Sequence, residues 1–105
     1  MQHNITLEKC REYSDFIDFE ILADGNKIGT LDIRSTESFI FIRHIRIEEK
    51  FRRNGYAREA VDQLRLLNKP ISLAISTHSE SAAPFWQSYF QGKHVTCQRK
   101  TYYIN

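Results

Sequence analysis

A chain of 105 residues has room for one small domain, and 41% hydrophobic with 27% charged residues is the balance of a folded globular protein, which excludes disordered and fibrous classes. A net charge of +2 is too small to indicate a polyanionic partner by itself. The two cysteines lack C-x-x-C spacing, so no zinc, redox or other metal site is expected. The sequence shows no signal peptide or long apolar stretch, which predicts a cytoplasmic protein without a membrane partner.

The first third of the chain reads as antiparallel strands. Residues 4–10 alternate weakly, and residues 16–22 alternate clearly, with apolar side chains at every second position. Asp24-Gly25 is a hairpin signal, because the turn that joins two strands most tightly needs positive φ at its centre. Residues 27–34 then return as the partner strand.

The middle of the chain predicts a strand, a helix and a second strand. Residues 38–48 begin with a run that is apolar at both odd and even positions, as expected of a central strand that is covered on both faces. A helix over about residues 55–68 has an apolar face at three- and four-residue spacing and stops before Pro70. Residues 71–76 alternate again, and a strand–helix–strand unit implies a parallel pair with a right-handed crossover. An aromatic-rich helix over about 81–90 and a last strand or hairpin over 94–104 complete the chain.

The turn between the central strand and its helix carries the strongest functional signal. Its sequence is Arg52-Arg53-Asn54-Gly55-Tyr56-Ala57, followed by Arg58. The first N–H groups of a helix have no partner within the helix and lie at the positive end of its dipole, so such a turn binds anions, phosphates above all. A glycine there lets the backbone approach a ligand closely.

Six basic residues also gather between positions 43 and 58: Arg43, Arg46, Lys50, Arg52, Arg53 and Arg58. A solvated basic edge and a nucleic-acid surface are two other interpretations of this cluster. The sequence has no RNP, helix-turn-helix or zinc signature, which disfavours nucleic acid. Because the cluster coincides with the phosphate-binding turn, we favour a nucleotide cofactor.

The R-x-x-G-x-A turn in this setting resembles motif A of the GNAT superfamily of acetyl-CoA-dependent N-acetyltransferases, and the order of elements over residues 16–105 is similar to the GNAT core. The resemblance implies one α+β domain over residues 1–105. It would have a three-layer arrangement: a mixed, mainly antiparallel central sheet with one parallel strand pair, and helices packed on both faces. It departs from the family at its N-terminus, where about fifteen residues replace the usual strand and helix pair, so an open acceptor side is expected.

The resemblance also assigns acetyl-CoA as cosubstrate. In the family the turn grips the diphosphate, and the pantetheine arm runs along the central strand, here near Ile45 and Ile47. A position in the second helix contacts the pantetheine, and here Ser79 and Ala82 stand in the N-x-x-A pattern. The expected cofactor-binding residues are therefore Ile45, Ile47, Arg52, Arg53, Asn54, Gly55, Tyr56, Ala57, Arg58, Ser79 and Ala82.

Amine acetylation asks for a base, because a lysine amine with a pKa near 10.4 is protonated at neutral pH. Glu48, at the strand end, is the first candidate, and Glu49, the next residue, and His44, at the strand centre, are the others. Trp86 stands where the family has the tyrosine that protonates the thiolate, so Tyr89, one helical turn on, is the candidate acid. Each also has a structural interpretation: Glu48 as an arginine partner, and His44 and Tyr89 as packed residues.

The acceptor is expected to be a lysine or N-terminal amine of a protein, because the missing N-terminal helices leave little to enclose a small molecule, although a homodimer would rebuild a wall. The alternative is a catalytically inactive module that binds CoA or another protein, with Trp86 marking lost activity.

Overall fold

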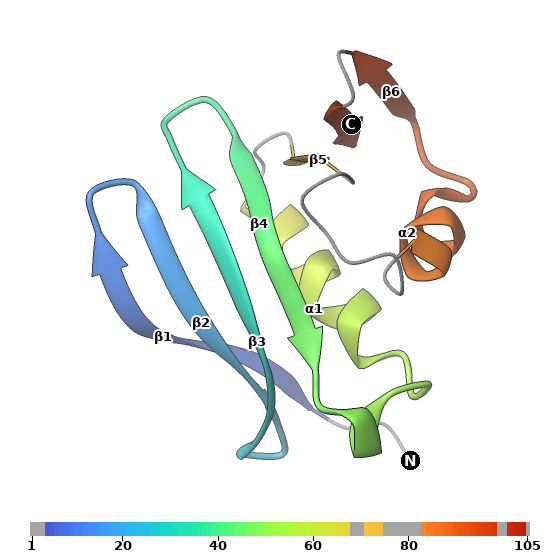
Figure 1. The fold of residues 1–105 in the computed structure, drawn as a ribbon. Coiled ribbons are helices and arrows are strands. Elements are labelled where there is room, and N and C mark those ends of the chain that lie inside the picture. Colours follow the sequence, from blue (N-terminus) through green and yellow to red (C-terminus); the bar gives the residue numbers. More distant parts are fainter. Residues whose placement is uncertain (1–3, 68–70, 75–82, 99–100, 105) are drawn as a thin grey trace.

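The computed structural model describes residues 4–67, 71–74, 83–98 and 101–104. They form a seven-stranded sheet in the order β1-β2-β3-β4-β5-β7-β6, in which only β4 and β5 run parallel (Figure 1). This confirms the predicted mixed, mainly antiparallel sheet with one parallel pair and β4 at its centre. The strands are β1 Ile5–Tyr13, β2 Phe16–Ala23, β3 Asn26–Ser35, β4 Ile40–Ile47, β5 Ile71–Ala74, β6 Val95–Gln98 and β7 Thr101–Ile104.

The hairpins follow the predicted turn chemistry, with one difference in length. Asp24 and Gly25 have φ values of 52° and 86°, as the turn between β2 and β3 requires. Strand β1 continues to Tyr13 instead of ending at Cys10, and Tyr13 pairs with Phe16 across a tight turn. Most of the outer part of β1 is exposed, so no apolar alternation marked it in the sequence. The closing segment is a hairpin, β6 and β7.

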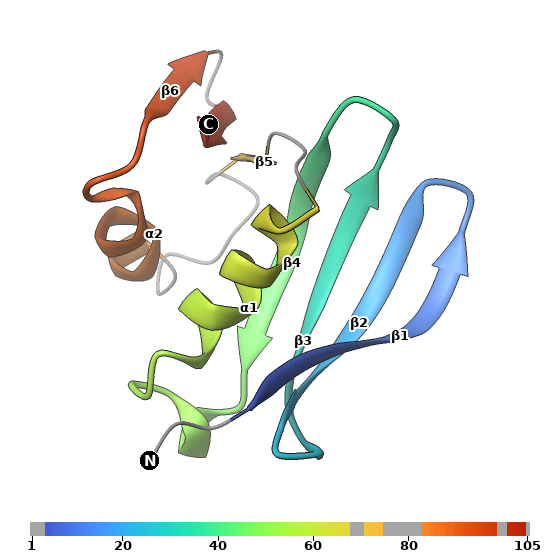
Figure 2. The same ribbon diagram turned by 180° about the vertical axis from the view of Figure 1, so that it is seen from behind.

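Helix α1, Tyr56–Arg65, covers the central strands from one side: it lies behind β4 in Figure 1 and in front of it in Figure 2. Ala60, Val61 and Leu64 are buried in the core beside Ile40 and Ile42 of β4. The helix ends three residues before the predicted position, in a turn at Leu66. None of the described helices is long and apolar enough to cross a bilayer.

Helix α2, Ala83–Phe90, lies beside α1 and is joined to it by side chains. The hydroxyl of Tyr89 donates to Asp62 at 2.6 Å, and the guanidinium of Arg58 donates to the hydroxyl of Ser88 at 3.2 Å. Trp86 and Tyr89 are fully buried and meet edge to face, with ring centroids 6.0 Å apart. These side-chain contacts hold α2 against α1.

Candidate active site

Strands β4 and β5 separate half-way along β4. Their pairing runs from Ile40 with Ile71 to Ile42 with Leu73, and β4 then continues to Ile47 past the end of β5 (Figure 1). On its other side, β4 has an extra residue opposite β3, because Ile33 pairs with Ile42 while Asp32 pairs with His44. A bulge of this kind bends a strand and increases its twist. The bend at Arg43 thus coincides with the point where β4 leaves β5.

The free edge of β4 presents backbone groups to this gap. Glu48 directs its N–H to β3, where it donates to the carbonyl of Ile28 at 2.8 Å. Successive residues of a strand direct their backbone groups to alternate edges, so those of Ile47 and Ile45 point to the edge that β5 has left. The carbonyl of Ile47 accepts a hydrogen bond from Nε of Arg52 at 2.8 Å. Among the described residues no strand pairs with Ile45 on this edge, which is where the resemblance places the cofactor arm.

The segment after β4 is a compact turn. A short 3₁₀-helix, η1, spans Glu49–Phe51, and the side-chain amide of Asn54 donates back to the carbonyls of Phe51 and Arg52 at 3.0 and 3.2 Å. Arg53 and Gly55 have φ values of 67° and 78°. Gly55 caps α1, and a Cβ added to it would meet nothing within 4 Å, so the residue is required by its backbone conformation and leaves open space in front of the turn.

The N–H groups of this turn are available to a ligand. Among the described residues, no backbone acceptor is found for the N–H groups of Arg53, Asn54, Gly55 or Ala57. A peptide N–H that is left without a partner at a helix N-terminus attracts anions through its own dipole and through that of the helix. Positive φ at Arg53 and Gly55, with Asn54 between them, directs successive amides to the same side. Amides arranged in this way form a concave anion site.

A cleft of about 500 Å³ connects the turn with the free edge of β4. Its walls are residues 44–47 of β4, the turn and first residues of α1, and Phe85 and Ser88 of α2. Arg46, Arg52, Arg53 and Arg58 line the cleft, and no carboxylate does among the described residues. The cleft is therefore strongly positive and has the size of a ligand site. The expected residues Ile45, Ile47, Arg52, Arg53, Gly55, Tyr56, Ala57 and Arg58 all line it.

Three expected residues are not among those that line the cleft, and two residues that were not expected are. Asn54 acts on the turn backbone, and Ser79 and Ala82 lie outside the described residues. Sequence reasoning missed Phe85 and Ser88, which lie three positions apart and so share the face of α2 toward the cleft. The sequence could have indicated this role, because the three-residue spacing places an aromatic and a small polar side chain on one face of the helix.

Tyr89 is not brought to the cleft. Its side chain is fully buried, its ring is stacked on Phe85 at 5.9 Å, and its hydroxyl is held by Asp62. Burial, and then the hydrogen bond to Asp62, raise the pKa of Tyr89 well above its usual range. A phenol with a raised pKa that already donates to a carboxylate is a poor proton donor to a thiolate.

The substitution Tyr89→Phe is therefore expected to lower the free energy of unfolding by about 1 kcal/mol, through loss of the bond to Asp62, and to leave the rate of the acetyl transfer expected from the sequence unchanged. Thermal unfolding and initial rates measure the two effects. Tyr102→Phe, a half-buried tyrosine of β7, is the matched control for stability. A rate that drops tenfold or more in Tyr89→Phe would restore this residue as the general acid.

Two of the candidate bases occupy different places. His44 lines the cleft at the bend of β4, whereas Glu48 is exposed beyond the strand end and is not among the lining residues. His44 pairs across the sheet with Asp32, whose own neighbour on β2 is Asp18. Burial, and then the negative charge of Asp18, raise the pKa of Asp32. Asp32 did not stand out in the sequence, because its proximity to His44 depends on the bulge.

Several solved structures share this architecture. An acetyltransferase from Thermus thermophilus superposes over 87% of this chain with a TM-score of 0.66 and 18% identity. A GNAT family acetyltransferase from Elizabethkingia anophelis with acetyl-CoA bound matches 96% of this chain and 95% of its own, with a TM-score of 0.60 and 13% identity. The chain has the GNAT fold.

The GNAT likeness extends to a PaiA N-acetyltransferase from Thermoplasma acidophilum in complex with coenzyme A, with a TM-score of 0.54 and 14% identity over 86% of this chain. The chain spans 64% of the Thermus protein and 59% of the Thermoplasma protein. No family model matches the sequence, and the comparison with curated proteins gives no match. At these identities the likeness is one of fold, and the cleft residues must supply the argument for function.

Proposed function

We propose that this protein is an N-acetyltransferase that moves an acetyl group from acetyl-CoA to a primary amine by direct attack on the thioester. The observation that carries the proposal is the cleft. It joins the edge of β4 beyond its pairing with β5 to a turn whose N–H groups at Arg53, Asn54, Gly55 and Ala57 find no backbone acceptor among the described residues, and of the charged side chains described there, only arginines line it. Acetyl-CoA has an anionic diphosphate and an extended amide-containing arm, which match these two parts. The GNAT neighbours with acetyl-CoA or CoA bound support this choice.

In this proposal the turn from Arg53 to Ala57 holds the diphosphate, and the free edge of β4 near Ile45 holds the arm. A backbone N–H of that edge would stabilise the oxyanion formed as the amine attacks, a contribution of about 3 kcal/mol for one well-placed donor. The amine nitrogen forms a bond to the acetyl carbon, the carbon–sulfur bond breaks, and the coenzyme leaves as thiolate. Its thiol has an ordinary pKa near 8.5, so departure without a dedicated acid is feasible.

We assign His44 as the base that takes the proton from the amine, because it lines the cleft beside the bend of β4 and Glu48 does not. His44→Gln is expected to lower kcat at pH 7 by about 100-fold and to leave the affinity for acetyl-CoA unchanged. The deficit should shrink as the pH approaches the amine pKa, because the amine then loses its proton without help. An unchanged kcat in His44→Gln together with a loss in Glu48→Gln would transfer the role to Glu48.

Titration calorimetry with acetyl-CoA, followed by measurement of thiol release with amine acceptors, tests the proposal as a whole. Absence of heat at high micromolar acetyl-CoA would overturn it. Binding without transfer to any amine would favour the inactive CoA-binding module, for which the burial of Trp86 and the bond from Tyr89 to Asp62 are the supporting observations. The sequence predicts a protein lysine or N-terminal amine as acceptor, and mass spectrometry of acetylated proteins examines that class against the small acceptor that the lining of a second cavity favours.

A further inference from the structure

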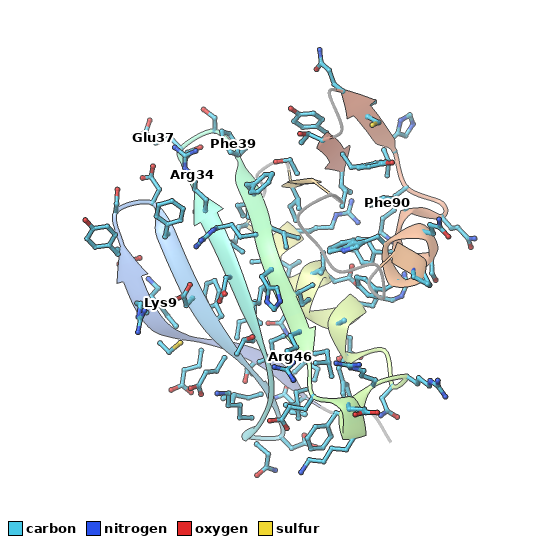
Figure 3. All side chains as sticks on the ribbon, in the orientation of Figure 1. Lys9, Arg34, Glu37, Phe39, Arg46 and Phe90 are labelled. Carbon is cyan, nitrogen blue, oxygen red and sulfur yellow. The ribbon has the colours of Figure 1, made fainter. Side chains whose placement is uncertain are left out.

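A second cavity of about 540 Å³ lies on the sheet face opposite α1, at the other half of β4. Its base is a row of residues in register across five strands: Phe16 of β2 pairs with Arg34 of β3, Arg34 with Phe41 of β4, Phe41 with Ser72 of β5, and Ser72 with Tyr103 of β7. Neighbours in such a row point to the same face of the sheet. Figure 3 shows Arg34 and Phe39 at this end of the sheet and Arg46 at the opposite end of β4.

The lining of this cavity is aromatic and cationic. Four aromatic residues and two arginines line it, together with Thr101 and Ser72, of which Ser72 is only 3% exposed. Arg43 lies over the ring of Phe16 at 4.6 Å. Within the described part of the chain, Arg34 has one ion-pair partner, Asp15 at 3.8 Å, and both side chains are half exposed. Such an exposed pair is weak and leaves most of the positive charge of Arg34 uncompensated, whereas Arg43 also interacts with the carboxylate of Asp32. The rings are those of Phe16, Phe39, Phe41 and Tyr103.

Successive residues at the bulge of β4 line the two cavities. Arg43 lines the second cavity and His44, the next residue, lines the acetyl-CoA cleft. A bulge puts two successive side chains opposite one residue of the partner strand, so it can present neighbours to two different sites. A molecule in the second cavity would thus have its reactive end beside His44, where the proposed thioester ends.

We propose that the second cavity binds the acceptor, and that the acceptor is a small amine carrying a carboxylate and an aromatic ring, as an aromatic amino acid does. This inference rests on the proposed function. An ammonium group alone would be repelled by Arg34 and Arg43, whereas a carboxylate on the same molecule pairs with a guanidinium in a two-pronged geometry. The four rings supply stacking and edge-to-face contacts for a flat ring.

The transfer step follows from this placement. The amine loses a proton to the imidazole of His44 and attacks the acetyl carbon, a carbon–nitrogen bond forms, and the carbon–sulfur bond of the thioester breaks. The nitrogen then gives up its second proton and the coenzyme thiolate takes up one, so the products are an N-acetylated acid and the coenzyme thiol. Acetylation removes the positive charge of the amine and leaves the carboxylate, so the product remains complementary to the arginines and is a suitable binding probe.

The transfer test compares L-phenylalanine with phenethylamine, which lacks the carboxylate, and with a lysine-containing peptide. We expect KM for phenylalanine to be at least tenfold lower than for phenethylamine, and to rise at least tenfold in Arg43→Gln and Arg34→Gln. Lys27→Gln, which removes a cation from the same strand as Arg34 at its other end, is the control and should change nothing. Equal use of phenethylamine, or a preferred lysine peptide that is indifferent to both arginine substitutions, would overturn the inference.

A binding test separates this inference from the proposed function. N-acetyl-L-phenylalanine is titrated into the protein without acetyl-CoA, and heat that is lost in Arg43→Gln but kept in Lys27→Gln and Gly55→Glu supports the second cavity even if transfer fails. Absence of binding by this probe, in a protein that binds acetyl-CoA and acetylates another amine, would overturn the inference and leave the proposed function standing.

Discussion

Replacing Gly55 by glutamate is expected to weaken acetyl-CoA binding by at least 100-fold while the protein stays folded. Gly55 caps α1 at φ 78° and lines the cleft. A Cβ at this position meets no atom within 4 Å, so the new side chain has room, and the strained conformation costs about 1 kcal/mol. Its carboxylate would stand among the N–H groups proposed to bind the diphosphate, where a second negative charge repels the ligand.

A matched control exists in the same chain. Gly25, in the turn between β2 and β3, has φ 86° and equally open space around its Cβ, so Gly25→Glu adds the same strain and the same charge away from the cleft. We expect Gly25→Glu to bind acetyl-CoA as the unchanged protein does, and circular dichroism to show both variants folded. If calorimetry gives the same affinity for Gly55→Glu as for Gly25→Glu, the diphosphate is not bound at this turn.

The turn itself was predictable because its chemistry is local. A glycine before an apolar-faced helix, a preceding strand and nearby arginines lie within about twenty residues of one another in the sequence, and α1, β4 and the Asp24-Gly25 turn all formed where these local signals placed them. The ends of elements were harder to predict. The exposed half of β1 forms through pairing with β2 and not through burial, so no apolar pattern marks where the strand ends.

The bend of β4 was also predictable from the sequence, where it interrupts the regular two-residue alternation of apolar side chains. The buried or half-buried isoleucines of β4 stand at positions 40, 42, 45 and 47, so the step from Ile42 to Ile45 is three residues where a regular strand requires two. A three-residue step keeps both halves of the strand facing the core only if one residue is bulged out. Arg43 is that residue, and the described pairing of β4 with β5 ends next to it, at Ile42.

Contacts between distant segments could not be read from the sequence. Tyr89 and Asp62 are 27 residues apart, and their hydrogen bond depends on how α2 lies against α1. This bond occupies the hydroxyl of the tyrosine that the sequence suggested as the acid. The aromatic row of the second cavity depends on the register of five strands, and a shift of one residue in any pair would send Arg34 or Phe41 to the other face. A prediction that gives the helices and strands but not the register between strands therefore finds the turn before α1 and misses the second cavity.

Replacing Gly29 by alanine is expected to destabilise the protein by about 3 kcal/mol, the upper part of the range for forcing an added group into a packed site. Gly29 of β3 is buried opposite Ile47, and a Cβ added there would lie 2.1 Å from the carbonyl oxygen of Arg46. The obstacle is backbone, which cannot rotate away as a side chain can. Strands β3 and β4 would have to separate at the end of β4 that forms the cleft.

The same displacement should reach ligand binding, because Arg46 and Ile47 line the cleft and the carbonyl of Ile47 anchors Arg52. Chemical denaturation measures the loss of stability, and calorimetry below the unfolding transition is expected to show at least tenfold weaker acetyl-CoA binding. Thr30→Ala, at the next position of β3, removes atoms instead of adding them and serves as the control for binding. Gly29→Ala with unchanged affinity would mean that the cleft edge of β4 is held by the turn at Arg52 and not by its spacing from β3.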